Sequence, residues 1–164
     1  MGYRQLTLVK YAQKLRADET LTSETRGAFF DSMCRLMCYA QSHGISLQWS
    51  ARGKAIYWPE QKVITISSSG SPVRMIHDLL HEFGHHKLER VRRFSLNQGT
   101  WSKTVPEILN TLNEEFEAWH QGRIISRSFG ICIDNDMFNR SEKRSLMSYV
   151  KWAARRGKKE KRWV

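Results

Sequence analysis

The segment from residue 72 to about residue 92 limits the fold of this chain more than any other feature. Its apolar residues recur at the spacing of one helix face. His81, Glu82 and His85 fall at or just beyond the margin of that face. A helix with one apolar side must be covered by other elements, so we expect the two histidines to lie along the rim of a cleft. The apolar arc is formed by Val73, Ile76, Leu79, Leu80, Phe83 and Val91.

The residues from His81 to His85 match the pattern H-E-x-x-H. Histidines four residues apart on a helix lie on the same face, so both imidazoles can reach one metal ion. Zinc prefers nitrogen, sulfur and carboxylate ligands in a tetrahedral arrangement. Glu82 lies beside the pair and can accept a proton from a water molecule. The pattern predicts a Zn²⁺ site with His81 and His85 as ligands and Glu82 as general base; the alternative is a surface helix that carries histidines by chance.

A catalytic zinc site usually has three protein ligands, so a third one must come from elsewhere. His77 is eight residues from His85, about 12 Å along a helix, and cannot share an ion with both other histidines. His86 points about 100° away from His85 and is also a poor candidate. The third ligand is therefore expected on another element.

The best donor lies on a second amphipathic helix. Glu115 sits at the edge of its apolar arc, whereas Glu114 and Glu117 are expected to project toward solvent. Ala118 and Gly122 flank Glu115, so the two helices could approach closely there. We therefore predict Glu115 as the third ligand. The apolar arc holds Val105, Ile108, Leu109, Leu112, Phe116 and Trp119.

The remaining sequence predicts an α+β domain in which helices precede and follow a short sheet of three or so strands. Residues 59–62 should join the last two strands as a hairpin, residues 93–103 should form a loop, and residues 128–139 are ambiguous. Ser71 and Pro72 are typical of a helix N-terminus, and Gly44 of a helix end. The other helices are expected at about 5–17, 24–42, 104–126 and 141–156, and the strands at 45–49, 54–58 and 63–66.

The chain carries a net charge of +11, from 27 Lys and Arg against 16 Asp and Glu. We expect one domain over residues 1–154 and a basic C-terminal tail over residues 155–164. The tail could bind nucleic acid through its phosphates, or it could simply be solvated. No apolar run is long enough to span a membrane, and residues 1–14 lack a secretory signal. The three cysteines are expected as reduced thiols in the core; the alternative is a functional pair formed by Cys34 and Cys38. Together these features predict a cytoplasmic protein.

H-E-x-x-H followed on a later helix by Glu115-Phe116-Glu117-Ala118 resembles the gluzincin metallopeptidases. The chain is most similar to the small ImmA/IrrE-like and phage-borne minimal zinc peptidases, over about residues 45–127. The resemblance implies a zincin-like fold, Glu115 as a zinc ligand, and the strand at 63–66 as an edge for an extended peptide.

Two departures from related patterns bear on this resemblance. Trp119 stands where thermolysin-like enzymes have Asp, so the partner of the ligand histidines cannot be carried over. SprT-like DNA-associated proteases share the first motif and the basic character, but their third ligand is usually His. His120 is the nearest candidate for that role, although its helical position favours solvent.

These features predict a zinc metallopeptidase that cleaves a protein or peptide substrate. The group that would stabilise the oxyanion stays open among His120, Arg123 and Tyr149. The alternative is a nucleic-acid-associated protein, either a SprT-like protease or a binding module, whose zinc site is secondary or structural. Glu82 argues against a structural site, because such a site needs no general base.

Overall fold

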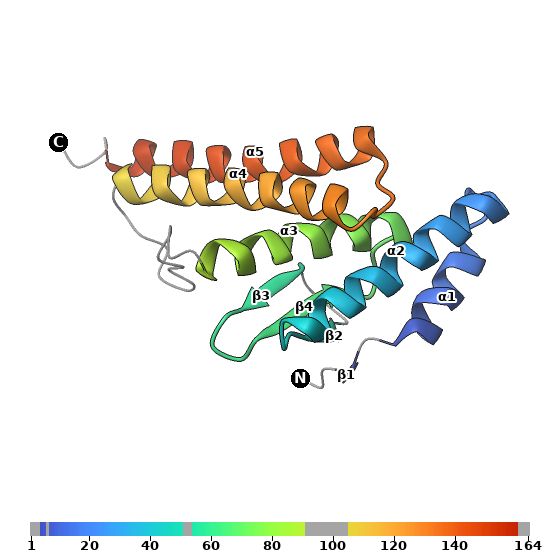
Figure 1. The fold of residues 1–164 in the computed structure, drawn as a ribbon. Helices are drawn as coiled ribbons and strands as arrows, with labels where there is room; N and C mark the ends of the chain where they lie inside the picture. The colour runs from blue at the N-terminus through green and yellow to red at the C-terminus, as the bar shows by residue number, and fades with distance from the viewer. Residues whose placement is uncertain (1–3, 6, 51–53, 91–104, 161–164) are drawn as a thin grey trace.

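A long buried helix, α3 (Pro72–Arg90), lies at the centre of the fold, between a small sheet and two long helices (Figure 1). The computed structural model describes residues 4–5, 7–50, 54–90 and 105–160. Within these ranges the chain is α+β, as predicted. Before α3 come β1 (Arg4–Gln5), α1 (Leu8–Ala17), α2 (Ser23–Ser42), β2 (Ser46–Ser50), β3 (Ile56–Trp58) and β4 (Val63–Ser67), and after it come α4 (Val105–Ser128) and α5 (Asn135–Glu160).

The sheet has the strand order β1-β2-β4-β3. β2 and β4 are parallel, and β3 pairs antiparallel with β4, which confirms the predicted hairpin. The expectation that the strand at 63–66 offers an open edge was wrong, because β4 is paired on both sides. β3 is the edge strand next to α3 instead, and the short β1, which the sequence did not predict, pairs with β2.

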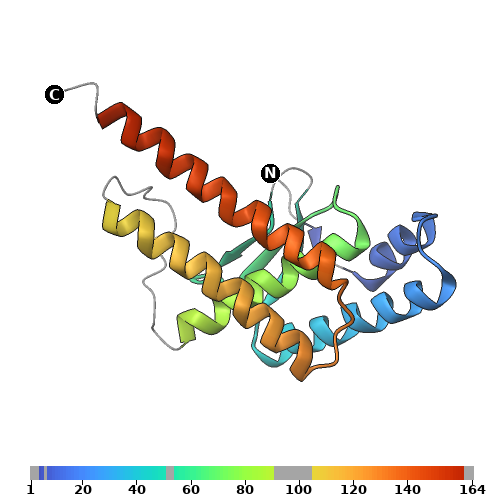
Figure 2. The same ribbon diagram turned by 90° about the horizontal axis from the view of Figure 1, so that it is seen from above.

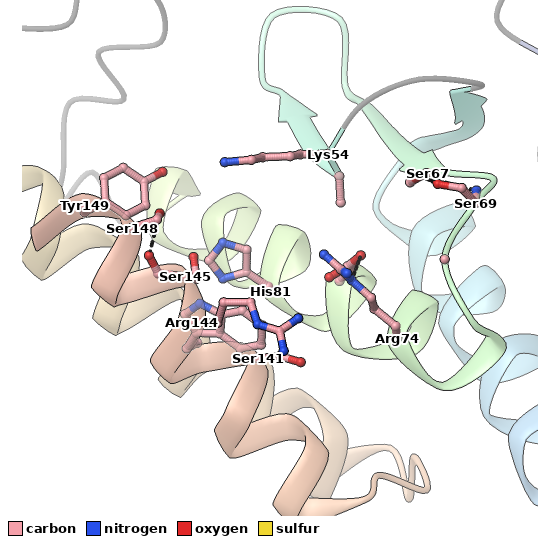
Figure 3. Close-up of a pocket in the computed structure, with 14 residues that line it drawn as sticks. Lys54, Ser67, Ser69, Arg74, His81, Ser141, Arg144, Ser145, Ser148 and Tyr149 are labelled. Carbon is pink, nitrogen blue, oxygen red and sulfur yellow. Dashed lines mark hydrogen bonds and ion pairs between the residues drawn. The ribbon is translucent and has the colours of Figure 1, made fainter. Parts of the chain in front are cut away.

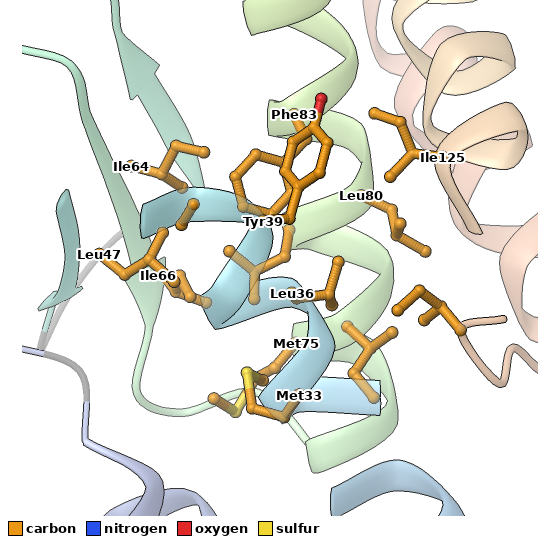
Figure 4. Packing of buried hydrophobic residues seen from close by; sticks show 14 of the residues in the cluster. Met33, Leu36, Tyr39, Leu47, Ile64, Ile66, Met75, Leu80, Phe83 and Ile125 are labelled. Carbon is orange, nitrogen blue, oxygen red and sulfur yellow. The ribbon is translucent and has the colours of Figure 1, made fainter. Parts of the chain in front are cut away.

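Helix α3 is buried on nearly all sides, because different elements cover its two faces. One face packs on the sheet and on α2, where aliphatic and aromatic side chains from each element interlock (Figure 4). The other face is covered by α4 and α5, which run antiparallel across it (Figure 2). Of the predicted apolar arc, Val73, Ile76, Leu79, Leu80 and Phe83 are buried, and Val91 lies outside the described residues. The core residues in this region include Met33, Leu36, Tyr39, Leu47, Ile64, Ile66, Met75, Leu80 and Phe83.

The predicted helix ends at α2 and α3 are confirmed. The Ser71 hydroxyl accepts a hydrogen bond from the Arg74 amide at 3.3 Å, so Ser71 caps α3. Helix α2 ends at Ser42, and Gly44 follows with φ of 68°, a left-handed conformation that glycine adopts without strain.

Other predicted boundaries differ from the structure. Helix α1 begins at Leu8 rather than residue 5, because residues 4–5 join the sheet. Helix α5 covers residues 135–160 rather than 141–156. It therefore includes residues 135–139, which the sequence left ambiguous, and residues 155–160 of the predicted basic tail. The loop predicted at 93–103 and the end of the basic tail at 161–164 lie outside the described residues.

Two predictions of burial were wrong. On α4, Leu109 and Phe116 were expected in the buried arc, yet they are 59% and 50% exposed. The buried face of α4 is instead formed by Ile108, Glu115, Ala118, Trp119 and Ile125, and Leu109 and Phe116 lie outside it. The three cysteines are free, as predicted, but Cys38 and Cys132 are exposed and Cys34 is only partly buried, so they are not core thiols.

Candidate metal centre

Three metal-ligand side chains converge between α3 and α4: His81, His85 and Glu115. The Nε2 atoms of the two histidines lie 3.2 Å apart. Glu115 places Oε2 at 3.3 Å from the His81 Nε2 and Oε1 at 3.6 Å from the His85 Nε2. Around a tetrahedral zinc with bonds of about 2.0–2.1 Å, neighbouring ligand atoms are about 3.3 Å apart. The donor set and its spacing therefore fit one zinc ion.

The close approach of α3 and α4 depends on two glycines. A Cβ atom on Gly84 would overlap the backbone carbonyl of Ala118 on α4. A Cβ atom on Gly122 would lie 2.6 Å from the carbonyl oxygen of Leu80 on α3. Real Cβ atoms do not approach backbone that closely, so each helix needs glycine where it meets the other. This contact brings Glu115 within reach of the histidines, as expected from Ala118 and Gly122.

Glu115 is held in place as a carboxylate. Burial alone would raise its pKa, but hydrogen bonding to His81 and the charge of the two imidazoles lower it. The Tyr149 hydroxyl on α5 donates a hydrogen bond to Oε1 at 2.7 Å, which lowers it further. The resulting pKa is about 2, so the side chain is ionised throughout the neutral range.

Glu82 lies next to the triad, in a different electrostatic environment. Its side chain is buried, and the backbone N–H of Tyr57 on β3 donates to Oε2 at 2.7 Å. Desolvation raises the pKa of Glu82 to about 7, with a further contribution from the Glu115 carboxylate, while His85 and the Tyr57 amide oppose the shift. Two neighbouring carboxylates thus have pKa values far apart, which is a common arrangement where one group binds and the other moves protons.

Each ligand histidine has a neighbour on α4. The Glu114 Oε1 lies 3.4 Å from the His85 Nδ1, within ion-pair distance but outside hydrogen-bond geometry. The prediction that Glu114 projects into solvent was therefore wrong; its side chain is 15% exposed. The Trp119 ring stacks on the His81 imidazole with centroids 4.4 Å apart. Glu114 and Trp119 thus flank the two histidines, while the Nδ1 atoms of His81 and His85 have no hydrogen-bond partner among the described residues.

The remaining candidate histidines lie outside the triad, as predicted. His77 is fully buried, four residues before His81, and its imidazole packs edge-on against Phe138. The Tyr57 hydroxyl donates to Glu89 at 2.7 Å, and its oxygen lies 2.8 Å from the His86 Nδ1. His120 is exposed.

The structure separates the three groups considered for the oxyanion. Arg123 donates to Asn139 and Glu142 at 2.9 Å each and lies over the Phe138 ring. Tyr149 is the one of the three that lines the cleft beside His81 (Figure 3). Burial and the Glu115 charge raise its pKa, so its hydroxyl keeps its proton at neutral pH.

Sequence reasoning missed three contributors to this site. Gly84 lies inside the H-E-x-x-H pattern, and a small residue facing Ala118 could have been recognised there. Glu114 was assigned to solvent because the apolar arc of α4 was centred on the side of Leu109 and Phe116, whereas the buried residues of this helix, such as Glu115 and Ala118, lie on another side. Trp119 was predicted in the apolar arc and noted as a departure from another family's pattern, but not as a partner of His81.

Comparisons with protein-family models, with curated proteins and with solved structures found no match. Among the described helices, none combines the length and apolar character needed to cross a bilayer.

Proposed function

We propose that this chain is a zinc-dependent peptidase with a zincin-like arrangement of its two site helices. The observation that carries the proposal is the convergence of His81, His85 and Glu115 at tetrahedral spacing, with Glu82 buried beside them. A structural zinc site usually has four protein ligands and needs no general base. The three donors here, together with Glu82, favour a catalytic site.

Glu82 has the properties of a general base. A group with a pKa near 7 can both accept and release a proton near neutral pH. The Tyr57 amide fixes one carboxylate oxygen, which leaves the other free to accept a proton from water. When bound, a zinc ion would polarise the scissile carbonyl and lower the pKa of water. Glu82 would then deliver the accepted proton to the leaving amine.

Tyr149 is the best placed donor for the oxyanion that forms during peptide hydrolysis. Its hydroxyl is protonated, lines the cleft and is already within hydrogen-bond distance of a proposed ligand. There it would donate to a substrate oxygen bound beside His81. Neutral donors aimed at developing charge are among the largest contributors to catalysis.

The edge strand favours a peptide as substrate. β3 carries Tyr57, whose N–H contacts Glu82, and β3 lies at the end of the strand order. An extended peptide can add to such an edge through main-chain hydrogen bonds. This addition would bring a peptide bond next to the general base, so β3 replaces the strand at 63–66 in the proposal.

The proposal is tested with fluorescently labelled casein as an unstructured substrate and with Glu82→Gln as the variant. Gln is nearly isosteric with Glu but cannot accept the proton, so turnover should fall by about 100- to 10,000-fold. Zinc content and melting temperature should stay close to wild type. Glu117→Gln, on α4 but outside the triad, is the matched control and should cleave normally. Undiminished turnover by Glu82→Gln would remove Glu82 from the mechanism.

A further inference from the structure

A cleft with a volume of about 360 Å³ opens beside His81. This volume lies within the range of about 300–1,000 Å³ that is typical of ligand sites. Its walls come from several parts of the chain: the segment before β3, the segment after β4, and helices α3, α4 and α5 (Figure 3). Because His81 and Tyr149 line it, a group bound in the cleft would lie next to the bond that is cleaved.

The charges in the cleft are predominantly positive. Lys54, Arg74 and Arg144 line it together with one carboxylate, Asp78, so three cations less one anion leave a net charge of +2. Arg74 is paired with Asp78, its Nε lying 3.6 Å from Oδ2. Within the described part of the chain, no ion pair joins Lys54 or Arg144 to an acidic side chain. Two cations on opposite walls are therefore available to a ligand.

Neutral hydrogen-bond donors surround these cations. Ser141, Ser145 and Ser148 lie at helical spacing on α5 and line the same wall as Arg144. The Ser148 hydroxyl now donates to the Ser145 carbonyl at 2.7 Å. A hydroxyl that rotates away from a backbone carbonyl can donate to an anion instead. The cleft thus offers charge and directed donors to one carboxylate.

We propose that this cleft is a specificity subsite that binds an acidic side chain, Asp or Glu, next to the scissile bond of a peptide substrate. The inference rests on the proposed peptidase function and names its substrate class. The free cations face one pocket, whereas a phosphate backbone would call for a basic stripe along a groove. The net charge of +11 would also attract acidic protein segments to the site.

The test uses the zinc-loaded full chain and three dipeptide hydroxamates that differ only in one side chain: Glu, Gln or Lys. The hydroxamate anchors on zinc and directs the side chain into the neighbouring cleft, and calorimetry measures binding without any need for cleavage. Wild type should bind the Glu compound most tightly and the Lys compound least. Each cation should contribute about fivefold to the affinity for the Glu compound. The double variant Lys54→Ala/Arg144→Ala should therefore bind the Glu compound about 25-fold more weakly and the Gln compound nearly as tightly as wild type. Lys143→Ala, an exposed neighbour on α5, is the control and should bind all three compounds like wild type.

The outcomes separate this inference from the proposed function. Equal binding of the three compounds, or a preference for Lys, would overturn the acidic subsite even if casein is cleaved. Ordered binding without casein cleavage would support an acidic-ligand site in the cleft and count against the peptidase function. An oligothymidylate that displaces the Glu compound from wild type with higher affinity would overturn the inference in favour of nucleic acid. Arg144→Glu should shift the preference toward the Lys compound.

Discussion

His77 should make the stability of this protein fall as the pH falls from about 6.5 toward 4. The side chain is fully buried, and neither ring nitrogen has a hydrogen-bond partner among the described residues. Burial lowers its pKa from 6.5 to about 4, and the Asp134 charge opposes this only in part. Replacing His77 with Leu removes the titrating group and keeps an apolar side chain against Phe138.

The sign and size of the effect follow from proton linkage. Between pH 4 and 6.5 the unfolded chain holds a proton on His77 that the folded chain does not, so the free energy of unfolding rises with pH. The stability contributed by the neutral imidazole is fully present above about pH 6.5 and is lost as the pH falls through this window. With the two pKa values, His77 makes the protein less stable at pH 5 than at pH 8 by about 2 kcal/mol.

Urea unfolding at pH 8 and pH 5 measures the free energy of unfolding of wild type and of His77→Leu. A chelator keeps metal loss from contributing at low pH. The difference in the free energy of unfolding between wild type and His77→Leu should change by about 2 kcal/mol from pH 8 to pH 5, because the two proteins share all other titrating groups. His120→Gln, which removes an exposed histidine, should behave like wild type. An equal pH dependence in wild type and His77→Leu would refute the reasoning.

Two further variants test how the site is built. Gly84→Ala should destabilise the protein by about 1–3 kcal/mol and weaken zinc binding, because the added Cβ meets the Ala118 backbone. The control is Gly27→Ala on α2, where the added Cβ meets open space. It should leave zinc binding intact and raise the melting temperature slightly. Equal zinc affinity in both variants would contradict the role of the helix contact. Tyr149→Phe should lower zinc affinity or casein turnover by about 10- to 100-fold, because Glu115 loses its hydrogen-bond donor; unchanged values of both would exclude this role.

Local patterns were sufficient to predict the hairpin and the presence of the five described helices, but not where α1 and α5 begin. Ser71 and Gly44 marked helix ends because capping is a property of a few neighbouring residues. The α+β class followed from the order of periodic segments. β1 escaped prediction because two residues carry no periodicity, and the edge position of β3 depends on long-range pairing that no local pattern encodes.

Helical geometry predicted the candidate triad more completely than it predicted the surroundings. His81 and His85 share a face by spacing, and Glu115 was selected because it lies at the margin of the apolar arc. Glu114 was misplaced because the apolar residues Leu109 and Phe116 turned the predicted buried face of α4 away from it. In the structure, α4 faces α3 with the side that carries Glu115, Ala118 and Gly122, so Phe116 is exposed while Glu114 reaches His85.

Zinc content tests the central claim most directly. Purified wild type and Glu117→Ala, the control on the same helix, should each hold about one zinc per chain. Glu115→Ala should lose the ion while keeping its helical content, because it removes one of three converging donors. Equal zinc content in Glu115→Ala and Glu117→Ala would contradict the proposed metal centre.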